Sequence, residues 1–126
     1  MSENRLQSIR VLLIEDEAMI AMLLEDVLEE LGCNVVGTGS SLASAVELAT
    51  TLDFDVALLD VNLRGERSDP VRVILRQRGI PFVLSTGYAE SGADGNVRGE
   101  PRLQKPFDID QLAAALVSAL GPMQNT

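Results

Sequence analysis

The chain has 126 residues and a formal net charge of −9, and 46% of its residues are hydrophobic. This length fits one domain, and the apolar content is sufficient for a core without disulfides. The excess of acidic residues argues against binding to a nucleic-acid backbone, which needs clustered lysines and arginines. Histidine is absent, which excludes imidazole chemistry, and the single cysteine, Cys33, cannot form a disulfide within the chain.

The first ten residues, MSENRLQSIR, lack the apolar core of a secretory signal. No apolar run approaches the roughly 20 residues that span a bilayer. These features and the free thiol predict a soluble, cytoplasmic protein without a membrane contact. No linker or repeat marks a second domain, so we expect one domain over residues 9–121, with tails at 1–8 and 122–126.

The first quarter of the chain predicts a strand followed by a helix. Residues 11–16 (VLLIED) are a continuous apolar run that ends in acids, which is typical of a strand buried on both faces of a parallel sheet. Apolar side chains then recur at helical spacing as far as Gly32, which favours a helix end. They are Ile20, Leu23, Leu24, Val27 and Leu31.

The pattern of strand and helix is repeated twice in the middle of the chain. Residues 33–39 (CNVVGTG) predict the second strand, and either Ser40 or Ser41 can cap the helix that follows. Residues 55–61 (DVALLDV) predict the third strand. After a polar loop over residues 62–69, the next helix begins near Pro70, a residue favoured in a first turn, and ends before Gly79.

The last third of the chain contains one weak segment. Residues 80–86 (IPFVLST) predict the fourth strand and residues 102–104 the fifth. Between them, residues 87–101 contain four glycines, each of which costs a helix about 1 kcal/mol relative to alanine. We therefore expect a short or irregular fourth helix there. Asp108 can cap a final helix that ends at Gly121.

Strands that alternate with helices predict a parallel sheet with helices on both faces. Five strands in this order predict an α/β, flavodoxin-like, doubly wound domain with strand order 2-1-3-4-5. In such sheets, ligands bind beyond the carboxyl ends of the strands, near the switch point between strands one and three.

Reactive side chains stand at the ends of four of the five predicted strands. Glu15 and Asp16 end the first strand and Asp60 ends the third. Three clustered carboxylates need a positive partner, and Mg²⁺ suits oxygen ligands of this kind. Thr86 ends the fourth strand and Lys105 follows the fifth. Each residue is unremarkable alone, but the set predicts phosphoryl transfer with Asp60 as the nucleophile that forms an aspartyl phosphate.

Four segments together resemble the receiver domain of two-component response regulators: VLLIEDE, ALLDVNL, STGY and LQKPFD. The resemblance spans about residues 9–121. It implies that Asp60 is the phosphoacceptor and that a histidine kinase is the phosphodonor. It also implies that Mg²⁺ is bound by Asp16, Asp60 and the backbone carbonyl of Asn62, with Glu15 acting through water. By the same resemblance, Lys105 contacts the phosphoryl group and Thr86 is the switch hydroxyl.

The chain departs from the usual receiver pattern at Arg102, where receivers often carry an aromatic residue that couples to the switch hydroxyl. Tyr88 could take over that role, or residues 87–101 could rearrange on phosphorylation. The stretch PFVLSTGY is similar to the Pro-Phe-x-Phe-Ala-Thr-Gly-Gly/Tyr motif of a subgroup that lacks this aromatic switch, with Leu84 and Ser85 replacing Phe and Ala. Members often pair with kinases of the HWE type.

The sequence therefore predicts a stand-alone receiver that signals through protein contacts and is an enzyme only in its own phosphorylation and dephosphorylation. A phosphate sink for a shared kinase is an alternative, as are a pseudo-receiver that never takes phosphate and, more remotely, a phosphatase of the haloacid-dehalogenase type. The first helix is a candidate kinase-docking face, since Ala18, Met19 and Met22 could be exposed there; the alternative is that they belong to the core.

Overall fold

The computed structural model describes residues 5–87 and 101–121. In it, five parallel strands form one sheet in the order β2-β1-β3-β6-β7. The strands are β1 (Arg10–Ile14), β2 (Asn34–Gly39), β3 (Val56–Asp60), β6 (Phe82–Thr86) and β7 (Arg102–Gln104). The helices are α1 (Ala18–Glu30), α2 (Leu42–Thr51), α3 (Asp69–Arg78) and α4 (Ile109–Leu120). The predicted flavodoxin-like fold and its strand order are confirmed, with element ends shifted by one or two residues.

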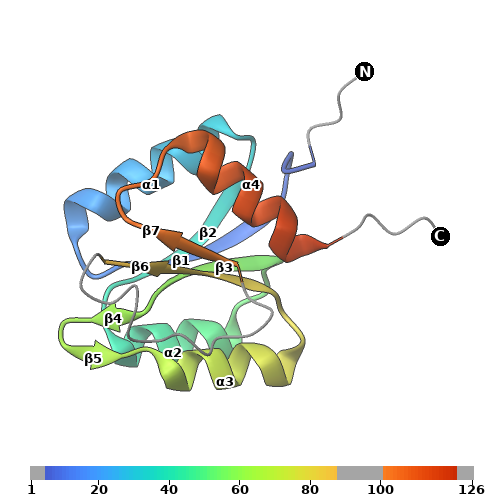
Figure 1. The fold of residues 1–126 in the computed structure, drawn as a ribbon. Helices are drawn as coiled ribbons and strands as arrows, with labels where there is room; N and C mark the ends of the chain where they lie inside the picture. Colours follow the sequence, from blue (N-terminus) through green and yellow to red (C-terminus); the bar gives the residue numbers. More distant parts are fainter. Residues whose placement is uncertain (1–4, 88–100, 122–126) are drawn as a thin grey trace.

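Helices cover both faces of the sheet, α1 and α4 on one face and α2 and α3 on the other (Figure 1). This explains why the central strands β1, β3 and β6 are apolar along most of their length. Leu58 contributes to the core under α1 and α4, and its neighbours Ala57 and Leu59 contribute to the core under α2 and α3. Successive strand residues point to opposite faces, so a strand with two covered faces needs no polar positions.

The helix ends follow from local chemistry. Ser41, one of the two candidate caps, accepts a hydrogen bond from the backbone N–H of Ser44, whose hydroxyl accepts one from the Ser41 N–H in return. Asp108 and Gln111 form the same reciprocal pair at the start of α4. Gly79 ends α3 with φ of 72°, a conformation that favours glycine. These reciprocal bonds satisfy backbone donors that a helix leaves unpaired.

Two predictions about local structure are wrong. The stretch expected as a loop contains a small antiparallel hairpin, β4 (Asn62–Leu63) with β5 (Glu66–Arg67). Leu23, expected on the buried face of the first helix, has 63% of its surface exposed. The buried stripe of α1 runs instead through Ala21, Leu24 and Leu28, and Leu23 lies more than a third of a turn from the centre of this stripe.

The N-terminal stretch assigned to a tail contributes to the packed structure. Leu6 is 3% exposed and belongs to the core beneath α1 and α4, and the Ser8 N–H donates a 2.8 Å hydrogen bond to the Gly32 carbonyl. The expected irregular fourth helix and Tyr88 fall within residues 88–100, outside the described residues. Among residues 5–87 and 101–121, no helix combines the length and the apolar character that a membrane crossing requires.

Candidate functional site

Three carboxylates meet at the carboxyl edge of the sheet, between β1 and β3. Asp60 is the last residue of β3, and Glu15 and Asp16 directly follow β1, whose Ile14 pairs with Leu59. One oxygen from each carboxylate lies within 4.8 Å of the others. Glu15 and Asp60 are buried, at 1% and 4% exposure, while Asp16 is half-buried. The convergence predicted from the strand ends is therefore present at the expected switch point.

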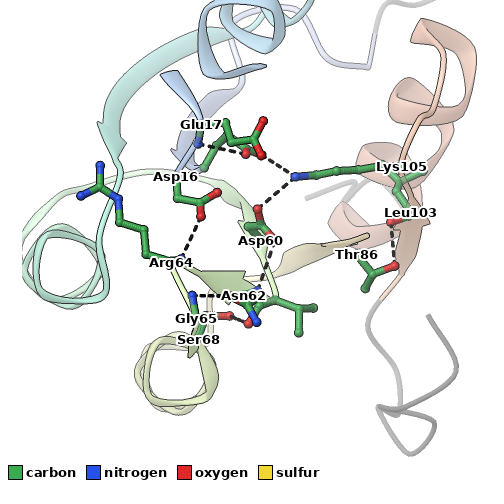
Figure 2. Close-up of polar contacts among 12 residues, drawn as sticks. Asp16, Glu17, Asp60, Asn62, Arg64, Gly65, Ser68, Thr86, Leu103 and Lys105 are labelled. Atoms are coloured by element: carbon green, nitrogen blue, oxygen red, sulfur yellow. Dashed lines mark hydrogen bonds and ion pairs between the residues drawn. The ribbon is translucent and has the colours of Figure 1, made fainter. Parts of the chain in front are cut away.

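Lys105 reaches this cluster from the loop after β7. Its Nζ lies 2.9 Å from Glu15 Oε1 and 3.0 Å from Asp60 Oδ2, as Figure 2 shows for the Asp60 contact. The ammonium therefore bridges two carboxylates that belong to neighbouring strands. One cation against three acids leaves an excess of negative charge at the sheet edge.

Burial and ion pairing act in opposite directions on the acids of this cluster. Burial raises the pKa of Asp60 and of Glu15, and the hydrogen bonds from Lys105 oppose the rise without cancelling it. Burial alone would lower the pKa of Lys105, but its bonds to the two carboxylates outweigh that effect and raise it. The lysine therefore stays charged, and the two acids hold their protons more tightly than exposed carboxyl groups do.

The β4–β5 hairpin connects to two of the three acids through its backbone. The Asn62 N–H donates to Asp60 Oδ1 at 3.2 Å, and the Arg64 N–H donates to Asp16 Oδ2 at 2.8 Å. The turn is held by a 2.8 Å bond from the Gly65 N–H to Asn62 Oδ1 (Figure 2). Arg64 and Gly65 have φ of 54° and 85°. No pattern in the sequence predicts these contacts, although Asn62 and Gly65 are residue types that favour turns.

Thr86 is buried at the end of β6 but does not bond the carboxylates. Its hydroxyl donates a 3.4 Å hydrogen bond to the Leu103 carbonyl, so it is directed toward β7 (Figure 2). The Lys105 N–H donates to the Thr86 carbonyl at 2.8 Å and ties the two segments together. Of the predicted site residues, Glu15, Asp16, Asp60, Asn62 and Lys105 thus form one connected group, and Thr86 lies beside it.

The donor set fits a hard divalent cation such as Mg²⁺. All its side-chain ligand atoms are carboxylate oxygens, three acids can supply them from one small volume, and the charge is only partly neutralised by Lys105. The chemistry that this arrangement supports is displacement at phosphorus, with a carboxylate as nucleophile and positive charges around the transferred group.

An exposed apolar surface on α1 adjoins the cluster. Met19 and Met22 are 79% and 64% exposed, and Ala18 and Leu23 are exposed beside them. The alternative that these methionines belong to the core is therefore wrong. A groove of about 370 Å³ continues this surface toward the acidic cluster. It is lined by Ile20, Leu23, Leu24, Val27, Lys105, Pro106 and Phe107.

The fold and the acidic edge are those expected of a receiver domain, and comparison with known families agrees. The model of the response regulator receiver domain matches residues 11–117. The chain therefore belongs to the response regulator receiver domain family. This match removes the grounds for the alternative of a haloacid-dehalogenase-type phosphatase.

Several relatives of the chain are named as regulators. The phyllosphere-induced regulator PhyR of Methylorubrum extorquens is 35% identical over 115 residues, which are 87% of this chain and 43% of PhyR. The chain spans about half the length of the curated relatives it matches. The solution structure of SdrG from Sphingomonas melonis Fr1 is 46% identical with a TM-score of 0.80, covering 90% of this chain and 97% of SdrG. The solution structure of beryllofluoride-activated SdrG from Pseudomonas melonis Fr1 is 45% identical with a TM-score of 0.74, and the match covers 88% of this chain and 95% of SdrG.

Proposed function

We propose that the chain accepts a phosphoryl group on Asp60 from the phosphohistidine of a histidine kinase and then signals through contacts with a downstream protein in the cytoplasm. The observation that carries this proposal is the buried Asp60 carboxylate at the sheet edge, within 3.0 Å of the Lys105 ammonium and beside two further acids. The nucleophile Asp60, the acids that could bind a metal ion, and the Lys105 ammonium that could bind phosphoryl oxygens all lie at this sheet edge.

In the transfer, a carboxylate oxygen of Asp60 attacks the phosphorus of the phosphohistidine. An O–P bond forms while the P–N bond breaks, and the electron pair of the broken bond returns to the imidazole nitrogen of the kinase. The signal ends when the aspartyl phosphate is hydrolysed: water attacks the phosphorus, inorganic phosphate is released, and Asp60 leaves as a carboxylate. The chain is thus a substrate of its own chemistry and turns over no other compound.

The ionised form of Asp60 is the nucleophile, and burial works against it by raising its pKa. Asp16, Asp60 and the Asn62 backbone carbonyl would hold Mg²⁺, with Glu15 acting through water, and the ion would supply positive charge that favours the ionised carboxylate. Lys105 donates to the phosphoryl oxygens once they are present. The Thr86 hydroxyl turns from the Leu103 carbonyl toward the phosphoryl group, because an anionic oxygen is a stronger acceptor than a neutral carbonyl.

We assign the apolar surface formed by Ala18, Met19, Met22 and Leu23 to the kinase, which by the subgroup resemblance is of the HWE type. Leu23 also lines the groove that ends at Lys105, so a helical partner packed on this surface brings its phosphohistidine close to Asp60. Methionine suits such a contact since its side chain adapts to the shape of the partner.

The test is incubation of the purified chain with acetyl phosphate and Mg²⁺, followed by intact mass measurement. We expect a gain of one phosphoryl group on the wild type and none on Asp60→Asn or in the presence of a chelator. An unmodified wild type would show instead that the chain is a pseudo-receiver that serves only for docking.

A phosphate sink is the second candidate, and phosphorylation itself does not distinguish it from a signalling role. The difference lies in the partner. If phosphorylation changes the affinity for a cellular protein other than the kinase, the chain transmits a signal; equal affinity of both forms for every partner captured favours the sink.

A further inference from the structure

Ser85 is a buried hydroxyl that the phosphorylation chemistry above does not use. It is 1% exposed, and its Oγ forms no hydrogen bond with any atom of residues 5–87 and 101–121. The two other buried hydroxyls near the site differ in this respect. Ser68 Oγ donates to the Val61 carbonyl at 3.1 Å, and Thr86 Oγ1 donates to the Leu103 carbonyl. A buried hydroxyl without a hydrogen-bond partner destabilises the fold. Its presence therefore points to a second state of the domain in which this hydroxyl has a partner.

The register of the sheet places Ser85 beside the phosphoacceptor. Asp60 on β3 pairs directly with Ser85 on β6. Two residues earlier, the paired Leu58 and Val83 both lie in the core under α1 and α4. Because side chains alternate along a strand, Asp60 and Ser85 share that same face. Neighbouring strands are about 4.8 Å apart, so Ser85 is the β6 residue nearest in register to the Asp60 side chain on that face.

Lys105 crosses this position. Its backbone follows β7, and its Nζ bonds Asp60 on β3 and Glu15 beyond β1. Strand β6 lies between β7 and β3, so the lysine side chain passes over the end of β6. Ser85 is the β6 residue in register with Asp60 and also with Leu103, two residues before the lysine. It therefore belongs to the row of paired residues that joins Leu103, two residues before the cation, to the nucleophile Asp60.

We propose that Ser85 is a second hydroxyl of the phosphorylated site, which donates a hydrogen bond to an oxygen of the phosphorylated Asp60 side chain. In the unphosphorylated chain, the Asp60 oxygens are bonded by Lys105 and by the Asn62 N–H. Addition of a phosphoryl group brings new acceptor oxygens and draws Lys105 toward them, which leaves room for the Ser85 donor. This inference rests on the proposed function. The subgroup motif has alanine at this position, so the donor distinguishes this chain from that pattern.

The experiment is titration of the Mg²⁺-loaded chain with beryllofluoride, a phosphoryl mimic, in the wild type and in Ser85→Ala. Binding is followed by two-dimensional NMR, and thermal stability is measured with and without the mimic. We expect Ser85→Ala to weaken beryllofluoride binding about tenfold, as loss of a hydrogen bond to a charged group does. Without the mimic, the variant melts at the wild-type temperature or higher, because it loses only an unpaired hydroxyl.

The matched control is Ser68→Ala, which removes a buried hydroxyl that already has a partner. It lowers the stability of both forms and leaves the beryllofluoride affinity within about twofold of the wild type. If Ser85→Ala behaves like this control, or binds the mimic as tightly as the wild type, Ser85 has a structural role and the inference is wrong. A wild type that binds no beryllofluoride overturns the proposed function and this inference together.

Discussion

At the scale of single residues, Lys105 stands out because its one positive charge is shared between two carboxylates. One ammonium serves both Glu15 and Asp60, and Asp16 lies in the same cluster. A cation at this point competes with a metal ion for the same carboxylates. Lys105 therefore has two opposed effects: it neutralises charge when no metal is bound and repels the metal when one arrives.

Replacement of this lysine separates the two effects. Lys105→Met keeps the length of the side chain and removes its charge, so Mg²⁺ binds more tightly, by about tenfold for a lost like charge near the ion. Phosphorylation by acetyl phosphate falls, because the phosphoryl oxygens lose a donor. Calorimetric Mg²⁺ titration and intact mass give the two readouts. Weaker Mg²⁺ binding in the variant would contradict this account of the charge balance.

At the scale of elements, the β4–β5 hairpin is the part of the fold that fixes two of the acids. Its turn depends on Arg64 and Gly65, both with positive φ, and its backbone donates to Asp16 and Asp60. A hydrogen bond that a backbone N–H donates cannot be removed by changing the side chain of the same residue. A substitution can therefore weaken the bonds to Asp16 and Asp60 only by changing the backbone geometry of the turn.

Gly65→Ala tests the hairpin. A Cβ at Gly65 meets no atom within 4 Å, so the cost is backbone strain alone, about 1–2 kcal/mol of unfolding free energy. We expect the Mg²⁺ affinity to fall together with the stability, since the turn holds Asn62 and contacts Asp16.

Gly79→Ala is the matched control: φ there is 72°, the space around a Cβ is equally open, and the residue ends α3 away from the cluster. It lowers stability by a similar amount without changing Mg²⁺ affinity. Equal Mg²⁺ affinities in the two variants would separate the hairpin from the metal site.

Helix α1 supplies the second test at this scale. Met22 is exposed, so Met22→Glu leaves folding and phosphorylation by acetyl phosphate unchanged while placing a charge on the apolar surface. Phosphotransfer from a cognate HWE-type kinase slows at least tenfold, because a charge buried in an apolar contact is unfavourable. Glu47 on the exposed side of α2 offers a control position, and Glu47→Gln keeps wild-type transfer. Unchanged transfer in Met22→Glu would move the kinase contact elsewhere.

At the scale of the whole molecule, the acidic edge links stability to pH and metal. The pKa of Asp60 is raised on folding, so its carboxyl group stabilises the fold below its unfolded pKa of about 3.9, and this contribution is lost as pH rises through the folded pKa. At neutral pH, the ionised Asp60 is a cost to the metal-free fold. Mg²⁺ binds that ionised form and offsets the cost.

Asp60→Asn exposes this linkage. Without Mg²⁺, the variant is more stable than the wild type at pH 7 by of order 1 kcal/mol, and the difference shrinks as pH falls toward 4. With saturating Mg²⁺ at pH 7, the difference decreases or reverses, because the wild type gains more from the metal. Denaturant unfolding across this pH range, with and without Mg²⁺, measures both effects. A difference that grows toward acid would have the wrong sign and would refute a raised Asp60 pKa.

Much of the fold follows from the sequence because its signals are local or periodic. The run through Ala57, Leu58 and Leu59 requires two covered faces, and Ser41 and Asp108 carry their capping chemistry in neighbouring residues. The site follows because strand ends in a parallel sheet share an edge. The two-residue strands of the hairpin are too short to show a period, and Asn62 and Gly65 indicate only that the chain turns there.

Other features depend on three-dimensional relations that no local pattern contains. The exposure of Leu23 is decided by where α1 rests on the sheet, and apolar spacing fits more than one stripe. The orientation of Thr86 toward Leu103 is a choice of rotamer. The pairing of Ser85 with Asp60 requires the register between β3 and β6, which is set only when both strands are assembled.

The acidic edge takes its side chains from stretches of chain that lie up to 90 residues apart, from Glu15 to Lys105. No fragment of the polypeptide carries the nucleophile together with its partners, so a nascent or unfolded chain has no means of drawing phosphoryl groups from a kinase. Only the folded domain can therefore be phosphorylated. The contacts that form the phosphorylation site also ensure that an unfolded copy does not take part in signalling.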